Sequence, residues 1–178
     1  MKLKTLILII PFGLLSFNNN YRSEYPVPPK SEKLLFYIQR NLNKNTIIYD
    51  ANFDKNGMLA HDKPINVYWI EYEKNGQKTE LNKVEKIYAY GVKSSKFDKY
   101  KNQYQIQLVA DEKRSFILKQ EAPFKAAIYT KINNKLSKLN RLYIYADNSG
   151  FWPTVKYIEL FGKDIVTGSK NYEKIKHS

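Results

Sequence analysis

Residues 103–110 read QYQIQLVA, and this stretch decides the fold class. Its apolar side chains Tyr104, Ile106 and Leu108 alternate with three glutamines. Successive side chains of a β-strand point to opposite faces of a sheet. The alternation therefore predicts a strand with one face in the core and the other in water.

Eight further segments rich in aromatic and β-branched residues also predict strands. They are residues 34–41, 46–53, 65–73, 86–93, 114–119, 126–132, 141–146 and 155–161. Asn75-Gly76, directly after the third of these segments, is a strong hairpin signal. Residues 136–142 have the pattern of a helical turn instead.

The connections between these segments are short and polar, and no long helical pattern separates them. A parallel sheet needs crossover connections, which are usually helices, so an antiparallel arrangement is expected. The sequence predicts an all-β antiparallel domain of about eight to ten strands, with short loops and little helix. A two-sheet sandwich and a closed barrel both fit the pattern.

The N-terminus has the layout of a secretory signal peptide: Lys2 and Lys4, then an apolar run over residues 5–17. Such a run rises about 20 Å as a helix, too short to cross a ~30 Å hydrocarbon core, so no transmembrane span is expected. A buried core helix is the alternative interpretation. We expect residues 1–20 to be a signal peptide, residues 21–33 a proline-rich arm and residues 34–178 a single β domain. The mature protein is then periplasmic or extracellular.

Composition excludes several classes of site. The 178 residues contain no cysteine and only two histidines, which excludes disulfides, thiolate catalysis and zinc fingers. No cofactor is expected. The net charge is +13, but only four of the 30 basic residues are arginine and the lysines are dispersed. This pattern favours codon bias over a selected basic patch. An exported basic protein meets phosphate- or carboxylate-bearing envelope surfaces rather than nucleic acid.

An aromatic strand supplies the first candidate site. Tyr68 and Trp69 lie on opposite faces of the strand over residues 65–73, and Tyr90 repeats the theme farther along the chain. Aromatic side chains of this kind either line a ligand groove or form a core strand with hydroxyl groups at its wet edge.

Two charged residues interrupt otherwise apolar strands. Arg40 ends one strand, and Glu159 shares a predicted inward face with Val155, Tyr157 and Phe161. A buried carboxylate needs a partner, and a guanidinium can bind it with two hydrogen bonds. We therefore expect Arg40 and Glu159 to form an ion pair within the domain.

Residues 50–57 contain a weak calcium-loop pattern. Asn52, Asp54 and Asn56 place oxygen atoms at alternating positions before Gly57. Lys63 occupies the position where a calcium loop carries its closing glutamate. The alternative interpretation is a turn that uses Asn and Gly for their tolerance of positive φ, and no metal site is predicted.

No nucleophile elbow, phosphate-binding glycine loop or zinc-protease motif is present. Paired carboxylates for a hydrolase would have to come from Asp50, Glu71 and Glu159, and no spacing favours any pair. We expect a non-enzymatic binding or envelope-associated module using Arg40, Tyr68, Trp69, Tyr90 and Glu159. Its partner would be a small molecule, a glycan, a lipid or an envelope protein. A hydrolase and a structural partner of an envelope protein are the alternatives, and the oligomeric state is left open.

Several blocks resemble a known family. They are residues 26–29, 35–40, 45–49, 64–70, 89–91 and 157–164, with Thr167-Gly168 after them. In this order they resemble the DUF4833 family, small exported bacterial proteins grouped under a domain of unknown function, over roughly residues 25–176. The resemblance implies an exported bacterial protein. It implies no activity, substrate or catalytic residue.

Overall fold

The computed structural model describes residues 25–97, 102–150 and 153–176. The predicted signal peptide lies outside these ranges. The described strands are β1 (Leu34–Arg40), β2 (Asn43–Ala51), β3 (Ile65–Glu71), β4 (Gln77–Glu80), β5 (Val92–Lys96), β6 (Gln103–Leu108), β7 (Asp111–Ala122), β8 (Lys125–Ile132), β9 (Lys135–Asp147), β10 (Thr154–Asp164) and β11 (Lys170–Lys176). Within the same ranges, the 3₁₀ helix η1 (Tyr72–Lys74) and the helix α1 (Lys83–Tyr88) are the only helices, and neither is long enough to cross a bilayer.

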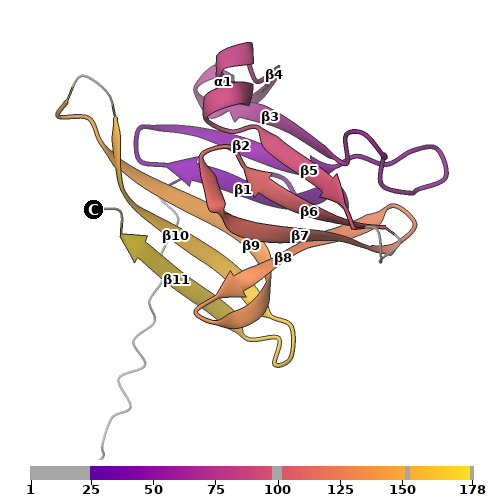
Figure 1. Ribbon diagram of the computed structural model, residues 1–178. Coiled ribbons are helices and arrows are strands. Elements are labelled where there is room, and N and C mark those ends of the chain that lie inside the picture. The colour runs from indigo at the N-terminus through magenta and orange to yellow at the C-terminus, as the bar shows by residue number, and fades with distance from the viewer. Residues whose placement is uncertain (1–24, 98–101, 151–152, 177–178) are drawn as a thin grey trace, which may run out of the picture.

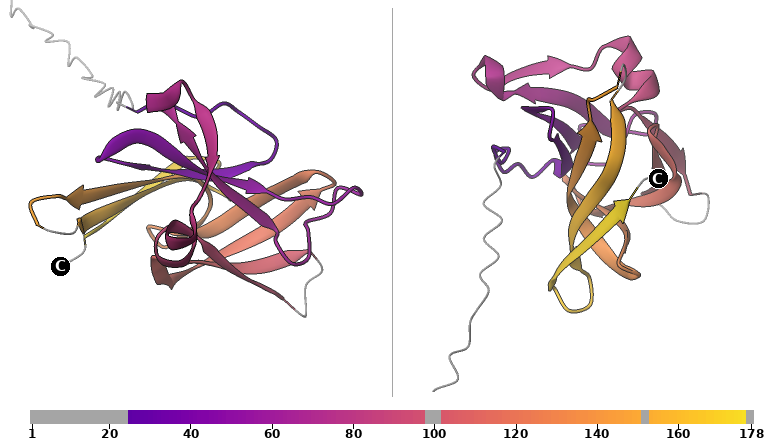
Figure 2. Two further views of the ribbon diagram at one scale, coloured as in Figure 1. Left: turned by 90° about the horizontal axis from the view of Figure 1, so that it is seen from above. Right: turned by 90° about the vertical axis from the view of Figure 1, so that its left-hand side faces the viewer.

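All eleven strands belong to one sheet, which curls into an open half-barrel (Figures 1 and 2). Its main path runs β4-β3-β2-β1-β9-β8-β7-β6-β5, and β10 and β11 extend from the other edge of β9. The all-β prediction is confirmed. Neither a separate two-sheet sandwich nor a closed barrel is found, because the terminal strands β4 and β5 are not paired with each other in the described chain.

One strand pair departs from the antiparallel prediction. Residues 37–40 of β1 pair in parallel with residues 141–144 of β9. A parallel pair needs a long connection but not a helical one. Here the connection consists of the intervening strands β2 to β8. The absence of crossover helices therefore does not exclude a parallel pair.

Strand β9 holds the two halves of the sheet together. On one edge, its first residues pair with β8 and its later residues pair with β1, while β10 lines most of its other edge. The sheet therefore divides at β9 and folds over itself. Phe36 of β1 stacks on Tyr49, with 4.2 Å between ring centroids, and faces Phe116 of β7 at 6.4 Å. This aromatic stack, with the inward side chains of β6 to β9, forms the core.

Two local predictions are wrong. Of the predicted strand over residues 86–93, only Val92 and Lys93 are extended, at the start of β5. The residues before them do not form a strand, because Asn82 and Glu85 make a reciprocal capping box that starts α1. Residues 136–142 do not form a helical turn. Asn133 and Asn134 both have positive φ, which makes the β8–β9 hairpin turn and leaves residues 135–147 extended.

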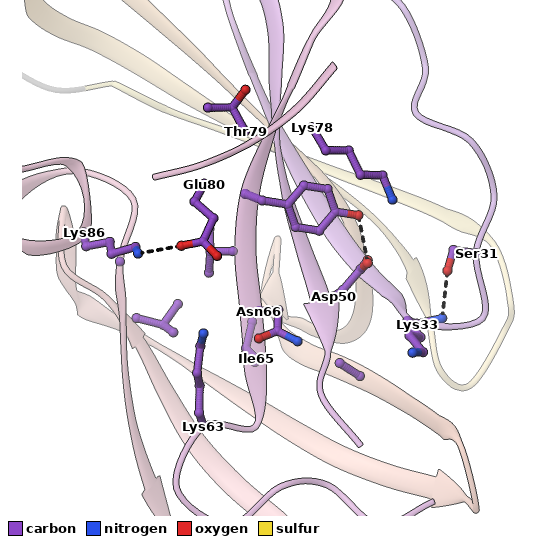
Figure 3. Close-up of a pocket in the computed structure, with 15 residues that line it drawn as sticks. Ser31, Lys33, Asp50, Lys63, Ile65, Asn66, Lys78, Thr79, Glu80 and Lys86 are labelled. Carbon is purple, nitrogen blue, oxygen red and sulfur yellow. Dashed lines mark hydrogen bonds and ion pairs between the residues drawn. The ribbon is translucent and has the colours of Figure 1, made fainter. Parts of the chain in front are cut away.

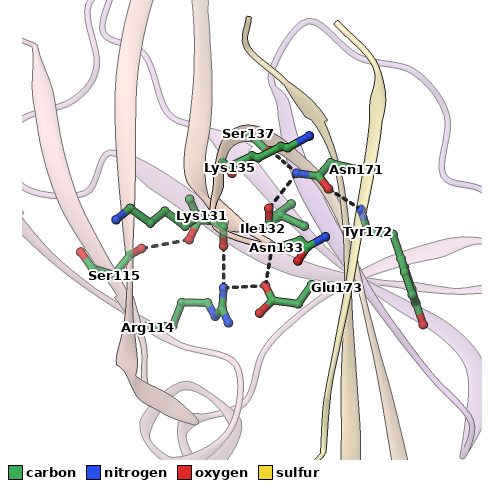
Figure 4. Close-up of polar contacts among 11 residues, drawn as sticks. Arg114, Ser115, Lys131, Ile132, Asn133, Lys135, Ser137, Asn171, Tyr172 and Glu173 are labelled. Atoms are coloured by element: carbon green, nitrogen blue, oxygen red, sulfur yellow. Dashed lines mark hydrogen bonds and ion pairs between the residues drawn. The ribbon is translucent and has the colours of Figure 1, made fainter. Parts of the chain in front are cut away.

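Strands β4 and β11 were not predicted, because polar residues occupy both of their faces. Side chains from β11 bind the β8–β9 turn (Figure 4). Asn171 Nδ2 donates to the Ile132 carbonyl at 2.7 Å, and Glu173 Oε2 accepts from the Asn133 amide at 3.2 Å. Arg114 of β7 completes the contact at 3.5 Å from Glu173. Hydrogen bonds and an ion pair thus hold β11 in place. An apolar strand pattern, which would have revealed it in the sequence, is missing.

The proline-rich arm lies on the outer face of β1 to β3. Pro28 is buried, and Gln39 Nε2 donates to the Pro26 carbonyl at 2.9 Å. Pro28 and Pro29 line a small hollow with Ile48 and Ile70. The arm therefore covers a second apolar face of the sheet, which explains why β2 is buried on both sides.

Candidate functional site

A pocket of about 690 Å³ lies where the curled sheet stays open (Figure 3). Strands β3 and β4 supply residues from one end of the sheet, whereas α1 and the start of β5 supply residues from the other. Its lining residues are Ser31, Lys33, Asp50, Ala51, Lys63, Ile65, Asn66, Val67, Tyr68, Lys78, Thr79, Glu80, Lys86, Gly91 and Val92. We call this space the seam pocket.

The backbone beside the seam pocket includes unpaired strand edge. Strand β4 pairs with β3 only over Tyr68–Glu71, so residues 65–67 have β2 on one side and no described strand on the other. Strand β5 likewise pairs only with β6 among the described strands. Two open edges therefore flank the pocket and leave backbone polar groups available to a ligand.

Positive charge dominates the seam pocket. Four lysines line it, namely Lys33, Lys63, Lys78 and Lys86, against the two acids Asp50 and Glu80. Lys86 Nζ lies 3.3 Å from Glu80 Oε2. The Lys78 ammonium lies 5.2 Å from the centroid of the Tyr68 ring. Because the lysines come from four separate segments, their convergence is a product of the fold.

Asp50 and Tyr68 form the polar centre of the pocket. They sit on neighbouring strands with side chains on the same face, and Tyr68 Oη donates to Asp50 Oδ2 at 2.9 Å. Burial raises the pKa of the Asp50 carboxyl, against the opposing effects of the Tyr68 hydrogen bond and of Lys78 and Lys33. Burial and the Asp50 contact raise the pKa of Tyr68 as well, so its hydroxyl stays a donor at physiological pH.

The other oxygen of Asp50, Oδ1, is buried and accepts no hydrogen bond within the described chain. A buried acceptor without a donor costs free energy. A hydroxyl or amino group of a ligand in the pocket would remove that cost.

Arg40 and Trp69 line a smaller hollow of about 270 Å³ that shares Thr79 and Glu80 with the seam pocket, and Tyr90 contacts both of them. Arg40 Nη1 donates to Tyr90 Oη, and the guanidinium carbon lies 4.8 Å from the centroid of the Trp69 ring. The Trp69 and Tyr90 rings meet edge to face at 5.3 Å. The structure therefore brings three of the five predicted site residues together.

This cluster also holds the curled sheet in shape. Tyr90 follows α1, and the Tyr49 hydroxyl donates to its carbonyl at 2.8 Å. A side chain at Gly91 would place its Cβ 1.8 Å from the Lys86 carbonyl oxygen, so only glycine fits there. The contacts of Tyr90 with β1, β2 and β3 fix the β5 end of the sheet beside the seam pocket.

Tyr68 and Glu159 lie apart from that cluster. Tyr68 points to the opposite face of β3, into the seam pocket. Glu159 accepts from Tyr172 Oη at 2.8 Å and lies 3.6 Å from Lys174 Nζ, both on β11. The predicted Arg40–Glu159 pair is wrong, because Glu159 lies on the outer face of β10 and finds its cation on the neighbouring strand.

The weak calcium pattern folds as a turn. Asp54 Oδ1 accepts from the amides of Asn56 and Met58, and Asn52 donates its side-chain amide to the Lys63 carbonyl. The described residues contain no group of three or more His, Cys, Asp or Glu side chains placed to hold a metal ion. The Asp54 carboxylate serves its own loop.

A third hollow, of about 790 Å³, lies between β7, β8 and the end of β11. Arg114 lines it and is already bound to Glu173 and to the Lys131 carbonyl. Lys113, Lys131 and Lys176 line it as well. Among the described residues, however, its lining has no buried polar side-chain atom without a hydrogen-bond partner, so this hollow is a weaker candidate than the seam pocket.

The seam-pocket lysines and Asn66 were missed by the sequence analysis. Asp50 was considered only as one of three acids for a hydrolase. Both strands were predicted, but their register was not: Asp50 stands opposite Asn66 and diagonal to Tyr68, all on one face of the β2–β3 pair. No local signal marks Lys33 or Lys86, which come from the arm and from α1.

A family model matches most of the chain. The family model described as "Domain of unknown function (DUF4833)" matches residues 36–174, which confirms the resemblance found in the sequence. No curated protein and no solved structure matches the chain.

Proposed function

The chain belongs to the DUF4833 family, whose description assigns no activity, and from the site alone we propose that it is a non-enzymatic binding module. Its seam pocket holds a ligand that carries a carboxylate or phosphate group together with a hydroxyl or amino group. An acidic sugar of the cell envelope has this chemistry.

The observation that carries this proposal is the combination of four lysines with the unpartnered Asp50 Oδ1 in one pocket. The lysines attract an anionic group, and a lysine ammonium is a compact donor suited to phosphate or carboxylate. Asp50 Oδ1 requires a donor. A ligand with both groups satisfies both demands, whereas a neutral sugar or a simple anion satisfies one.

A hydrolase with paired carboxylates is less well supported. Asp50 and Glu80 line the seam pocket, but Glu80 points toward Lys86 and away from Asp50 (Figure 3). In the neighbouring hollow, Glu85 accepts from Trp69 Nε1 and caps α1 through the Asn82 amide. A general acid and base need two carboxyl groups converging on one reacting bond. Glu71 lines that hollow too and lies 2.9 Å from Lys74 Nζ, so each of these acids contacts another side chain of the described chain.

Docking of another envelope protein is the second candidate, and the open edges of β5 and β11 support it. Lysines punctuate both strands, which is a common protection against edge-to-edge pairing. A partner strand would have to carry acidic residues to pair there.

Calorimetric titration with matched sugars tests the proposed function. Galacturonic acid and galactose differ only in the carboxylate, so the proposal predicts binding of the first and not of the second. In the variant carrying Lys63→Gln and Lys78→Gln, affinity for galacturonic acid falls by about tenfold or more, since two charge-assisted contacts are lost.

Lys119→Gln is the matched control, because Lys119 is exposed on β7, outside the seam pocket. Equal binding of both sugars, failure to bind galacturonic acid and glycerol phosphate alike, or an unchanged affinity in the double variant would each contradict the proposal.

A further inference from the structure

A second site, independent of the seam pocket, lies at the far end of the molecule. The β10–β11 turn and the start of β9 project away from α1 (Figure 1). We propose that this end docks onto an anionic lipid surface, with an apolar tip entering the headgroup layer and a row of lysines binding lipid phosphates.

The tip is exposed and apolar. Val166 is 88% exposed, Ile165 50% and Leu136 42%. Large aliphatic side chains gathered at one turn expose apolar surface to water. Moving them into an apolar phase lowers the free energy. Isolated exposed apolar residues are common, but these three are bonded into one unit.

Hydrogen bonds hold the tip in shape. The Ile165 amide donates to the Leu136 carbonyl at 3.1 Å, which joins the β10–β11 turn to the start of β9. Asp164 Oδ1 accepts from the amides of Val166 and Thr167 at 2.8 and 3.1 Å. These backbone bonds hold the pKa of Asp164 below its usual range. Its carboxylate is buried and turned into the loop, so the tip does not present it to a membrane.

A row of three lysines stands directly behind the tip. Lys163 of β10 pairs with Lys138 of β9 on one side and with Lys170 of β11 on the other. Like charges directly opposite in a sheet are destabilising. Glu121 reaches only one of the three, at 3.5 Å from Lys138 Nζ. The presence of three neighbouring lysines is explained if an anionic surface neutralises their charge.

The next row carries aromatic rings. Phe161 lies beside Arg141 and Tyr172 in the ladder, and the Arg141 guanidinium carbon lies 3.8 Å from the Phe161 ring centroid. From the end of the β10–β11 hairpin, the apolar tip therefore comes first and the lysines second. That order matches a bilayer surface, where the phosphate groups lie directly outside the hydrocarbon. The Arg141 guanidinium, one row farther back, adds positive charge on the same side of the sheet.

The β10–β11 hairpin that carries the tip is fixed to the rest of the sheet. The contacts of Asn171 and Glu173 with the β8–β9 turn lock β11 against the body of the sheet (Figure 4). A docked tip would therefore orient the whole molecule, with α1 and the seam pocket directed away from the membrane.

A fluorophore placed at the tip tests this proposal directly. The chain has no cysteine, so Val166→Cys gives one labelling site for an environment-sensitive dye in the full chain. Vesicles of phosphatidylcholine mixed with phosphatidylglycerol are expected to shift the emission of this dye to the blue. Adding Lys163→Glu and Lys170→Glu is expected to weaken the response by about tenfold or more, since each lysine contributes appreciably near an anionic surface.

Three controls keep the result interpretable. A dye at Val84→Cys, on α1 at the opposite end, is expected to show no shift, which separates tip docking from attachment by any other segment. Lys113→Glu with Lys119→Glu makes the same charge change elsewhere and leaves the response intact. Excess soluble glycerol phosphate leaves it intact as well, which separates a lipid surface from free phosphate.

An equal shift with phosphatidylcholine alone, an equal shift at Val84→Cys, or an unchanged response after Lys163→Glu and Lys170→Glu overturns the proposal. Competition by soluble glycerol phosphate overturns it too, because the row would then be a site for a small anion. Circular dichroism and melting temperature verify that each variant is folded.

Discussion

At the scale of single residues, Arg40 shows how a half-buried cation is accommodated without a carboxylate partner in the described chain. Its guanidinium donates to the Tyr90 hydroxyl and lies over the Trp69 ring. Arg40 Nε remains buried without a hydrogen bond in the described chain. Tyr90 therefore carries much of the polar compensation for this charge.

Replacing Tyr90 with Phe is expected to destabilise the protein by about 1–2 kcal/mol, because it removes one hydrogen bond to a charged group. Urea unfolding measures the loss. Tyr145→Phe is the matched control, since the Tyr145 ring stacks on Tyr157 on an exposed face. Equal stability of Tyr90→Phe and wild type would show that this hydrogen bond contributes nothing.

Asp50 predicts a pH dependence of stability. Burial raises the pKa of Asp50 from its ordinary value of 3.8, so the folded state retains this proton to higher pH than the unfolded state. The free energy of unfolding therefore falls as pH rises from about 3.8 through the raised pKa, and the loss is complete above it.

Asp50→Asn removes this loss and keeps an oxygen that accepts from Tyr68. We expect the ligand-free variant to melt about 2 °C above wild type at neutral pH, with the difference vanishing in acid below the ordinary Asp range. Calorimetric melting curves across this range measure it. A variant that melts below wild type at neutral pH, or a difference that grows in acid, has the wrong sign.

At the scale of elements, the row formed by Lys138, Lys163 and Lys170 has a measurable effect on stability. Lys163→Glu turns two repulsive cross-strand pairs into attractive ones. We expect a gain of about 0.5 kcal/mol in the free energy of unfolding, together with weaker vesicle docking. Lys119→Glu is the control, because its neighbours in the ladder are Gln103 and Ala127 and carry no charge. A Lys163→Glu variant less stable than wild type would contradict this account of the row.

Strands with a clean two-residue alternation were predictable, and β6 is the clearest case. Tyr104, Ile106 and Leu108 are buried, whereas the alternating glutamines are half-exposed. Strand β11 has the same alternation in exposure, but its inward side chains include Asn171 and Glu173. When the inward side chains of a strand are polar and bond to neighbouring elements, the sequence shows no alternation of apolar and polar residues. Such a strand cannot be predicted from hydrophobic periodicity.

Helix α1 was missed for a different reason. Ile87 and Tyr88 are apolar but exposed, and in the sequence they suggested the start of a strand over residues 86–93. The decisive signal was local: Asn82 followed three residues later by Glu85. In this stretch the capping residues, rather than the apolar composition, decide that the chain forms a helix.

At the scale of the whole molecule, the sequence could indicate an all-β fold but not the division of the sheet at β9. The β1–β9 pairing joins residues about a hundred positions apart, and no local pattern encodes it. The candidate site depends on the same long-range arrangement. Tyr68 was identified from its strand, but Lys33, Lys63, Lys78 and Lys86 converge only when β4 and β5 approach as the two ends of one curled sheet.

The same arrangement places the two candidate sites at opposite ends of the molecule. Lys86 of α1 lines the seam pocket, and the lysine-backed tip lies at the β10–β11 turn, far from α1 in Figure 1. Lysines that are dispersed along the chain gather at both places. The fold therefore concentrates them into two surfaces with different geometry.

Mass spectrometry of small molecules released from the purified protein tests the central claim most directly. Wild type is expected to release a molecule that carries a carboxylate or phosphate and a hydroxyl or amino group. The variant with Lys63→Gln and Lys78→Gln, purified in parallel, is expected to release little of it. Recovery of a neutral molecule, or of the same acidic molecule in equal amount from both proteins, would contradict a lysine-lined binding pocket at the seam.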